Sequence, residues 1–220
     1  LPLPWLRVSV LYSMGVSPTL DSVIWSSYAE ALLGVRVFGA TGEAAVDVPL
    51  KRRGAGLSPE VPVVKAWVPS HHALFVEAGG MTGLTSLQEC VENCDPEDPF
   101  AESPPEQTQL VMPLAGLRYV YHFDLKSKRR NARARFLLQA YAHVLGPPLN
   151  APEGPRYFPS DKSAGEPGVG GRIGISTSPF GACLAQILFG FGCLDGGVTL
   201  GYAPYPRFVM FEVQVGGFVY

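Results

Sequence analysis

Four cysteines are the first residues of this chain whose chemistry suits a nucleophile or a metal site. They are Cys90, Cys94, Cys183 and Cys193, in a chain of 220 residues. The Cys90-x-x-x-Cys94 spacing differs from the CxxC knuckle of structural zinc sites, and its acidic neighbours disfavour the thiolate that zinc requires. So few cysteines make no disulfide framework, and they favour a reducing compartment. We therefore predict no metal site, no cofactor and no intramolecular disulfide.

Histidines are the second source of chemistry. His71 and His72 are adjacent, and adjacent side chains of a strand point to opposite faces. A cysteine hydrolase would need Cys90 or Cys183 within hydrogen-bonding reach of His72, His122 or His143. The sequence around the cysteines has no nucleophile signature, and GxSxG is absent. We predict no catalytic residue and no enzymatic activity, with the hydrolase kept as a lesser alternative.

Two segments have a composition that can contact phosphate. The glycine-rich GEPGVGGRIG, residues 165–174, lacks the Gly-Lys-Ser/Thr ending of a phosphate loop and continues into a strand pattern, so we interpret it as a turn-rich loop. The run KSKRRNARAR, residues 126–135, carries six positive charges with no aromatic residue between them. We interpret it as a solvated loop and strand end, with contact to RNA phosphates or an acidic partner as the alternative.

Composition narrows the class of protein. The chain is 47% hydrophobic and 16% charged, with 25 glycines and 21 prolines. It is too apolar for a disordered chain and too often interrupted for a helical bundle. The net charge of −2 argues against a dedicated nucleic-acid-binding protein. Low charge on an apolar chain also suggests a surface that partners cover in a permanent assembly.

Alternation of polar and apolar residues predicts strands towards both ends of the chain. The clearest is LRYVYHFDLK, residues 117–126, in which Tyr119, Tyr121 and Phe123 share one face. The final predicted strand, residues 208–215, alternates in the same way. Further strands are predicted at 6–12, 34–38, 172–176 and 198–200.

Three segments are harder to assign. Residues 132–144 fit a strand and a helix equally well, and their composition favours a helix. We predict a strand there, because the order of the surrounding elements requires one. DSVIWSSYAEALL, residues 21–33, fits either a short helix or a strand. The stretch 89–107 holds seven carboxylates and four prolines, and we predict an exposed loop or extended arm.

Strands at this spacing, with long turn-rich connections, predict an antiparallel sandwich or barrel. We divide the chain into three parts on the same pattern. Residues 1–45 form a strand-rich N-terminal segment, which is either an arm or the end of a neighbouring domain. Residues 46–110 form an irregular proline-rich and acidic linker or arm, and residues 111–220 form the core.

The order of segments in residues 111–220 resembles the jelly-roll core of a picornavirus capsid protein, most closely the large one around the five-fold axes. LRYVYHFDLK, FLLQAYAHVLGPPLNAP, RIGISTSPFGACLAQILFGFG and GGVTLGYAPYPRFVMFEVQV resemble successive strands and turns of that family. WLRVSVLYSMG and YAEALLGVRVFGAT resemble the closing strands of a neighbouring capsid protein. Gly174 departs from the family pattern, which has a bulky residue at that position, and so does Cys183 after the Ser-Pro turn.

The resemblance implies an antiparallel jelly-roll β-sandwich with long loops and an extended terminal arm. It implies a structural protein of an icosahedral virus capsid, cut from a polyprotein and located in the virion after assembly in the host cytoplasm. The implied partners are other capsid protein chains, a host receptor and, through weak contact, the RNA genome. The alternative is a β-sandwich module that binds a ligand or carbohydrate.

The same resemblance implies a hydrophobic pocket inside the sandwich that takes a lipid-like molecule. A fully packed core built from the same side chains is the alternative. The residues expected to line the pocket share the apolar faces of the predicted strands: Tyr119, Tyr121, Phe123, Ile173, Ile175, Val209, Phe211 and Val213.

Overall fold

The structure is a computed structural model that describes residues 3–18, 23–47, 63–87, 106–126, 133–150, 169–179, 193–204 and 207–220. No helix long and apolar enough to cross a bilayer is present among these residues. Their regular structure consists of eight strands: β1 (Leu6–Pro18), β2 (Val23–Asp47), β3 (Val63–Leu87), β4 (Glu106–Lys126), β5 (Arg133–Leu145), β6 (Gly170–Pro179), β7 (Cys193–Pro204) and β8 (Arg207–Val219).

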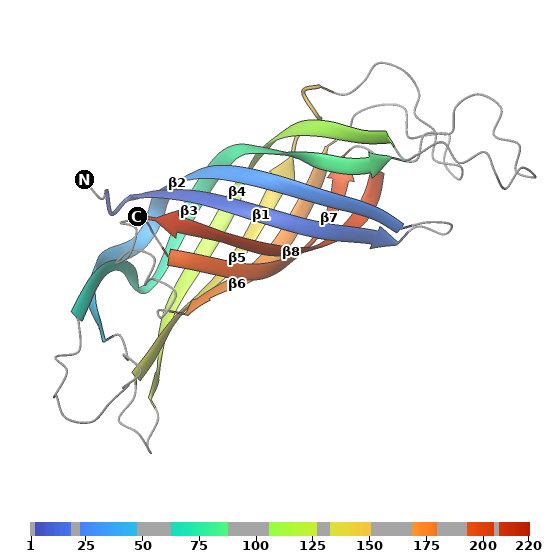
Figure 1. Cartoon of the computed structure of the whole chain (residues 1–220). Helices are drawn as coiled ribbons and strands as arrows, with labels where there is room; N and C mark the ends of the chain where they lie inside the picture. Colours follow the sequence, from blue (N-terminus) through green and yellow to red (C-terminus); the bar gives the residue numbers. More distant parts are fainter. Residues whose placement is uncertain are drawn as a thin grey trace, which may run out of the picture.

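The eight strands form one closed antiparallel barrel (Figure 1). Each strand pairs with its neighbours in sequence, and β8 pairs with β1 along a ladder from Val8↔Val219 to Val16↔Phe211. Closure leaves the sheet without an edge strand. Because the number of strands is even, both termini lie at the same end of the barrel, which we call the terminal end (Figure 1). The opposite end is the distal end.

The predicted all-β antiparallel class is confirmed, but the jelly-roll sandwich is not. A jelly roll needs Greek-key connections that distribute the strands over two facing sheets. Here every pair of consecutive strands is adjacent in a single closed sheet. The predicted division into three parts also differs from the structure. The one barrel takes strands from all three parts, and β3 lies wholly within the predicted irregular linker.

The individual strand predictions are confirmed by the positions of β1, β2, β4, β6, β7 and β8. Residues 133–145 form β5 despite their helix propensity, because ladders to β4 on one side and β6 on the other hold them extended. The ambiguous segment 21–33 is strand from Val23 onwards.

Several other predictions fall largely outside the described residues. Of the acidic stretch, only Glu106 and Gln107 are described, at the start of β4. Within the basic run, 127–132 lies outside, and the flanking residues end β4 and begin β5. The glycine-rich segment enters β6 at Gly170. Of the cysteines, only Cys193 is placed, at the start of β7, so the predictions about thiols and disulfides stay predictions.

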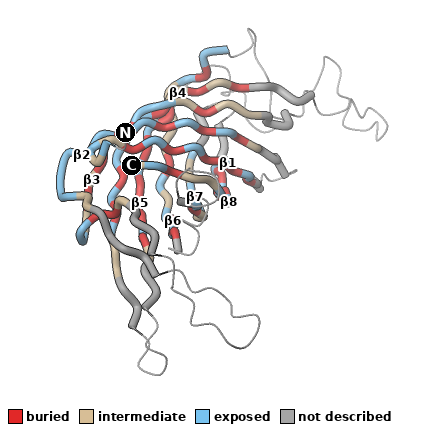
Figure 2. Tube along the Cα trace, turned by 60° about the vertical axis from the view of Figure 1, so that its left-hand side comes forward, coloured by how far each residue is buried: buried red, intermediate tan, exposed pale blue. Residues whose placement is uncertain are grey.

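Burial alternates along the strands, as a barrel requires (Figure 2). The side chains that point inwards form three layers. On β4, for example, Leu114 belongs to one apolar cluster, Arg118 to a polar layer, and Val120 to a second apolar cluster. The same order of apolar, polar and apolar residues recurs on β3, β5 and β8.

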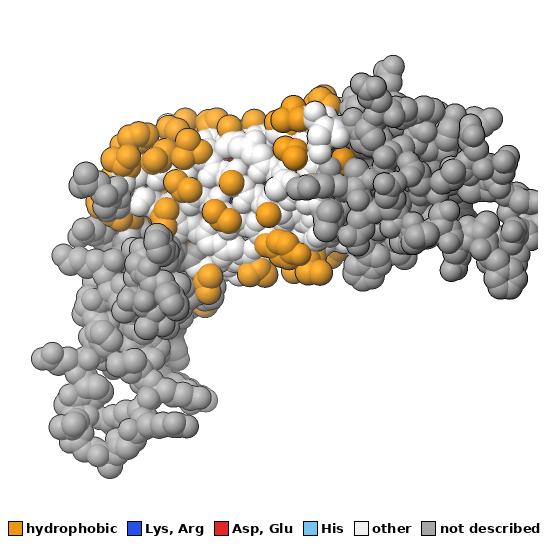
Figure 3. Space-filling view, turned by 45° about the horizontal axis from the view of Figure 1, so that its top comes forward, with side chains coloured by type: hydrophobic (Ala, Val, Ile, Leu, Met, Phe, Trp, Pro, Cys, Tyr) orange, Lys and Arg blue, Asp and Glu red, His pale blue; other side chains and the backbone are white. Residues whose placement is uncertain are grey.

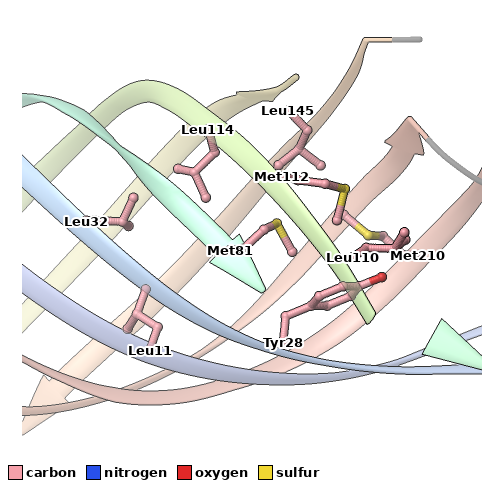
Figure 4. Close-up of a cluster of buried hydrophobic side chains, with 9 residues drawn as sticks. All are labelled: Leu11, Tyr28, Leu32, Met81, Leu110, Met112, Leu114, Leu145 and Met210. Carbon is pink, nitrogen blue, oxygen red and sulfur yellow. The ribbon is translucent and has the colours of Figure 1, made fainter. Parts of the chain in front are cut away.

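The first apolar cluster, which we call the distal cluster, lies nearer the distal end (Figure 4). Its side chains point into the barrel from β1, β2, β3, β4, β5 and β8 (Figure 4). They are Leu11, Tyr28, Leu32, Met81, Leu110, Met112, Leu114, Leu145 and Met210. The second, the terminal cluster, comes from strand ends at the terminal end: Val68, Ala73, Phe75, Val120, Leu137 and Phe218, with Tyr220 packed against them.

Two glycines shape the wall of the barrel. Gly39 has a φ of 82° and lies where the β2–β3 ladder shifts register, so β2 bends there as it passes the terminal end. A Cβ on Gly174 would lie 2.3 Å from Cζ and Oη of Tyr141, so only glycine leaves room for that inward-pointing ring.

Candidate functional site

The outer surface of the barrel is apolar on all eight strands. Every strand contributes exposed large hydrophobic side chains, such as Val10 on β1, Leu33 on β2 and Val215 on β8. Figure 3 shows such side chains spread over the described part of one face. Among the residues whose side chains the structure describes, no Lys, Arg, Asp or Glu is exposed. Water-soluble proteins normally carry charged residues over much of their surface, so this surface is unusual for one.

The charges of the chain are distributed unevenly. Of its 17 basic and 19 acidic residues, only eight have described side chains, and they belong to the barrel. Arg36 is partly buried, and the other seven are buried inside: Arg7, Glu30, Glu77, Arg118, Arg172, Asp195 and Glu212. The barrel therefore exposes apolar side chains on its outside and buries its ionisable side chains inside, between the two apolar clusters. A water-soluble barrel has its charged residues on the outside.

The eight residues predicted to line an interior pocket lie on the outside. Seven of them are exposed by 40% to 62%, and Phe123, which is partly buried, shares the outer face of β4 with Tyr119 and Tyr121. The sequence correctly grouped each set on one face, but the predicted inward orientation is wrong, because the alternate residues of the same strands point into the interior. These residues form no wall of an interior pocket. The binding of a lipid-like molecule stays a prediction.

Glu77 is at the centre of the interior polar layer. Nε of Arg118 donates to both Glu77 oxygens, at 2.8 and 2.9 Å. His143 Nε2 lies 3.0 Å from Glu77 Oε2, and Arg7 Nε lies 3.7 Å from Oε1. Three basic side chains from β1, β4 and β5 therefore surround one carboxylate on β3. Such close partners offset the cost of removing these charges from water.

A second ion pair joins Arg172 on β6 to Glu30 on β2. The contact is bidentate, with Nη1 2.7 Å from Oε1 and Nη2 2.5 Å from Oε2. Ser13 Oγ and Gln214 Nε2 also donate to Glu30 Oε1, each at 3.3 Å. Arg172 Nε lies 3.4 Å from His143 Nδ1, so His143 connects this pair to Glu77.

Amide and hydroxyl groups extend the network to β7 and β8. Gln139 receives a hydrogen bond from Arg118 Nη1 at 3.4 Å and donates to Asp195 Oδ2 at 2.9 Å. Ser176 Oγ donates to the same Asp195 oxygen at 3.1 Å. Tyr141 donates to the side-chain oxygen of Gln214 and lies 2.6 Å from the hydroxyl of Thr199.

Arg7 stabilises the seam of the barrel, the ladder between β1 and β8 at which the sheet closes. Its guanidinium carbon lies 3.8 Å from the ring centroid of Phe218, and Nη1 donates to the hydroxyl of Tyr220 at 3.1 Å. These contacts join the start of β1 to the end of β8 at the terminal end. A desolvated cation–π contact of this kind contributes about 2 kcal/mol.

Glu212 is the exception in the network. Both of its oxygens are buried, and neither accepts a hydrogen bond of normal geometry. The Ser13 hydroxyl lies close enough to favour the charged form slightly, but it donates to Glu30. Its one ion-pair contact is Arg172 Nη1 at 3.8 Å, and that guanidinium is already bidentate with Glu30.

Sequence reasoning did not identify this interior network. The available signal was the recurrence of single charged residues, such as Glu30, Glu77 and Arg118, at the alternate positions of otherwise apolar strands. The structure adds no support for the cysteine hydrolase alternative. Of its candidate histidines, His122 is partly buried, and His143 contacts Glu77 and Arg172. Within the described part of the chain, no group of three or more His, Cys, Asp or Glu is placed to hold a metal.

No family model, curated protein or solved structure matches this chain. The resemblance to picornavirus capsid proteins therefore has no support beyond the residues that suggested it. The capsid role, its partners and its location in a virion stay predictions.

Proposed function

We propose that the chain is a membrane-spanning β-barrel of the outer-membrane type, with lipid against its outer surface and a filled interior. The observation that carries this proposal is the inverted distribution of side chains. Strands of such barrels alternate apolar residues facing lipid with polar residues facing the interior. The exposed apolar wall and the buried ion pairs follow that pattern.

The height of the apolar wall supports a fit to a bilayer. On β8 the outward side chains from Val209 to Val219 are hydrophobic, apart from Gly217. At about 3.3 Å per residue and a tilt of about 40°, this segment spans about 25 Å along the barrel axis. Transmembrane barrels present an apolar band of about 25 Å.

Aromatic side chains outside the terminal end suit the boundary between lipid and water. Tyr121 stacks with Phe123 at a centroid distance of 6.3 Å, and Phe123 stacks with Phe136 at 5.5 Å. Phe38 stacks with His72 at 5.3 Å in the same region. Aromatic residues are enriched at both edges of the apolar band in such proteins.

The side chains that fill the interior favour a sealed barrel over a water-filled pore. An eight-stranded barrel is narrow enough for side chains to fill. Arg7, Glu77, Arg118 and Gln139 are each 0% exposed, and the distal and terminal clusters lie on either side of the polar layer. The proposed role is therefore a sealed membrane anchor for the segments that connect its strands. The capsid and ligand-binding-module hypotheses find no specific observation in their favour here.

Insertion into vesicles tests the proposal. Protein unfolded in urea is diluted into phosphatidylcholine vesicles, and flotation and protection from protease are measured. We expect the wild type to float and to become protected, and Val213→Arg, at the middle of the apolar band, to lose about 2–4 kcal/mol of stability in the bilayer. Ser70→Arg, an exposed polar site on β3, is the matched control and should behave as the wild type. Folding as a monodisperse protein in buffer without vesicles, with Val213→Arg tolerated, would contradict the proposal.

A further inference from the structure

The interior has one more carboxylate than guanidinium groups among the described side chains. Arg7, Arg118 and Arg172 supply three positive charges, and four acidic residues oppose them. These groups lie between two apolar clusters, remote from water. A buried charge without a partner costs several kcal/mol, so the imbalance must be compensated inside the barrel.

Only one of the four carboxylates receives no hydrogen bond of normal geometry. Glu77 and Glu30 each receive hydrogen bonds from a guanidinium, and Asp195 receives two from neutral groups. Glu212 receives none, although it is 0% exposed. Asp195 has no guanidinium partner either, but its two neutral donors make Glu212 the carboxylate with the fewest compensating contacts.

The surroundings of Glu212 favour a small cation over a further protein partner. Its register partners are Gly15 on β1 and Thr199 on β7, and neither can supply a positive charge. The charged groups closest in the network are Arg172 on β6 and Glu30 on β2, which bind each other. His143 on β5 is engaged by Glu77 and Arg172.

We propose that Glu212 is the site at which the closed interior takes up one positive charge, either a proton or a monovalent metal cation such as Na⁺. With the charge bound, Arg172 stays paired with Glu30. Without it, ionised Glu212 competes with Glu30 for the same guanidinium. The proposal does not rest on membrane insertion, since it concerns the interior alone.

Linked unfolding measurements test the site. Urea unfolding of the full chain in detergent micelles is followed in one series at varied pH with choline chloride, and in another at fixed pH with NaCl replacing choline chloride. A site that binds one proton or one Na⁺ only in the folded state raises the folding constant by up to tenfold for each tenfold rise in ligand activity. For a proton, stability therefore falls as pH rises.

Two neutral, nearly isosteric variants make the test specific. Glu212→Gln should be at least as stable as the wild type and should lose the dependence on that ligand. Glu30→Gln, the matched control, should be clearly less stable, because Arg172 loses its bidentate partner. The carbonyl stretch of a protonated carboxylic acid, present in the wild-type infrared spectrum and absent from Glu212→Gln, identifies the proton. A dependence on Na⁺ without that band identifies the metal cation.

Three results would overturn the proposal. The first is a wild type whose stability responds to neither ligand. The second is a response that persists unchanged in Glu212→Gln. The third is a loss of stability in Glu212→Gln as large as that in Glu30→Gln, which would show that Glu212 is an ordinary ion-pair partner.

Discussion

Arg118 and Glu77 form a buried ion pair inside the barrel, with Arg118 Nε 2.8 and 2.9 Å from the two Glu77 oxygens. The two residues lie on the adjacent strands β4 and β3 and are both 0% exposed. Arg7 and His143 approach the same carboxylate from two other strands. One acidic side chain therefore holds together four strands of the wall.

Replacing Glu77 with Gln is expected to destabilise the barrel by about 3–5 kcal/mol, because it leaves buried guanidinium groups without their counter-charge. Urea unfolding in micelles measures the loss. The double variant Glu77→Gln, Arg118→Gln should recover part of it, since it removes a cation together with its partner. Equal stability of the Glu77→Gln variant and the wild type would show that the pair does not support the fold.

Tyr121→Asp is expected to fold, with a loss of about 1 kcal/mol or less in a bilayer, because Tyr121 lies outside the barrel near the edge of the apolar band. The same change at Ile175, which is 57% exposed, should cost more if Ile175 lies deeper in the lipid. Vesicle flotation and urea unfolding measure both. Complete loss of folding in Tyr121→Asp would instead support an inward orientation of this side chain.

Gly174→Ala is expected to lose about 1–3 kcal/mol, since the new methyl group would overlap the ring of Tyr141. Thermal unfolding measures the change. In a Tyr141→Leu background, the same substitution should cost less, because the shorter side chain leaves space for the methyl group. An equal cost in both backgrounds would mean that the backbone, and not the ring, requires glycine.

Arg7→Lys is expected to destabilise the seam between β1 and β8 by about 1–2 kcal/mol despite the conserved charge. An ammonium group cannot reproduce both the stacking on Phe218 and the hydrogen bond to Tyr220. Hydrogen exchange of the β1 and β8 amides should increase more than that of β4 and β5. Uniform exchange across all strands would argue against a local role.

In planar bilayers the inserted wild type is expected to give no steady conductance above that of the lipid, because buried side chains fill the interior. Single-channel recording at high salt checks this. Regular, long-lived openings in wild-type protein would contradict the sealed-barrel part of the proposal while leaving membrane insertion intact.

Several parts of the fold follow from the sequence alone. Period-two alternation predicted strands within β1, β2, β4, β6, β7 and β8. For β5 the pattern fitted a helix equally well, and the strand was predicted from the order of the surrounding elements. Alternation also grouped Val209, Phe211 and Val213 on one face. Alternation is symmetrical, however, so it does not say which face of a strand turns inwards. That depends on the solvent around the barrel, and apolar residues face outwards when that solvent is lipid.

The contacts of the interior polar network could not be predicted from the sequence, for a different reason. Glu30 and Arg172 are separated by 142 residues, and their contact depends on the register of strands that are themselves not neighbours. A lone Arg or Glu in an apolar strand indicates an inward polar position, but it does not identify its partner. Only the closed geometry brings the two together.

Closure of β8 onto β1 has a consequence for how the chain is made. Arg7 and Tyr220, which meet at the seam, are 213 residues apart. β1 can pair with β2 early, but its second ladder cannot form until β8 has been synthesised. Contacts between such distant segments form slowly, and β1 has an unpaired edge until they do. A chain with this topology can therefore complete its sheet only after its last strand has been made.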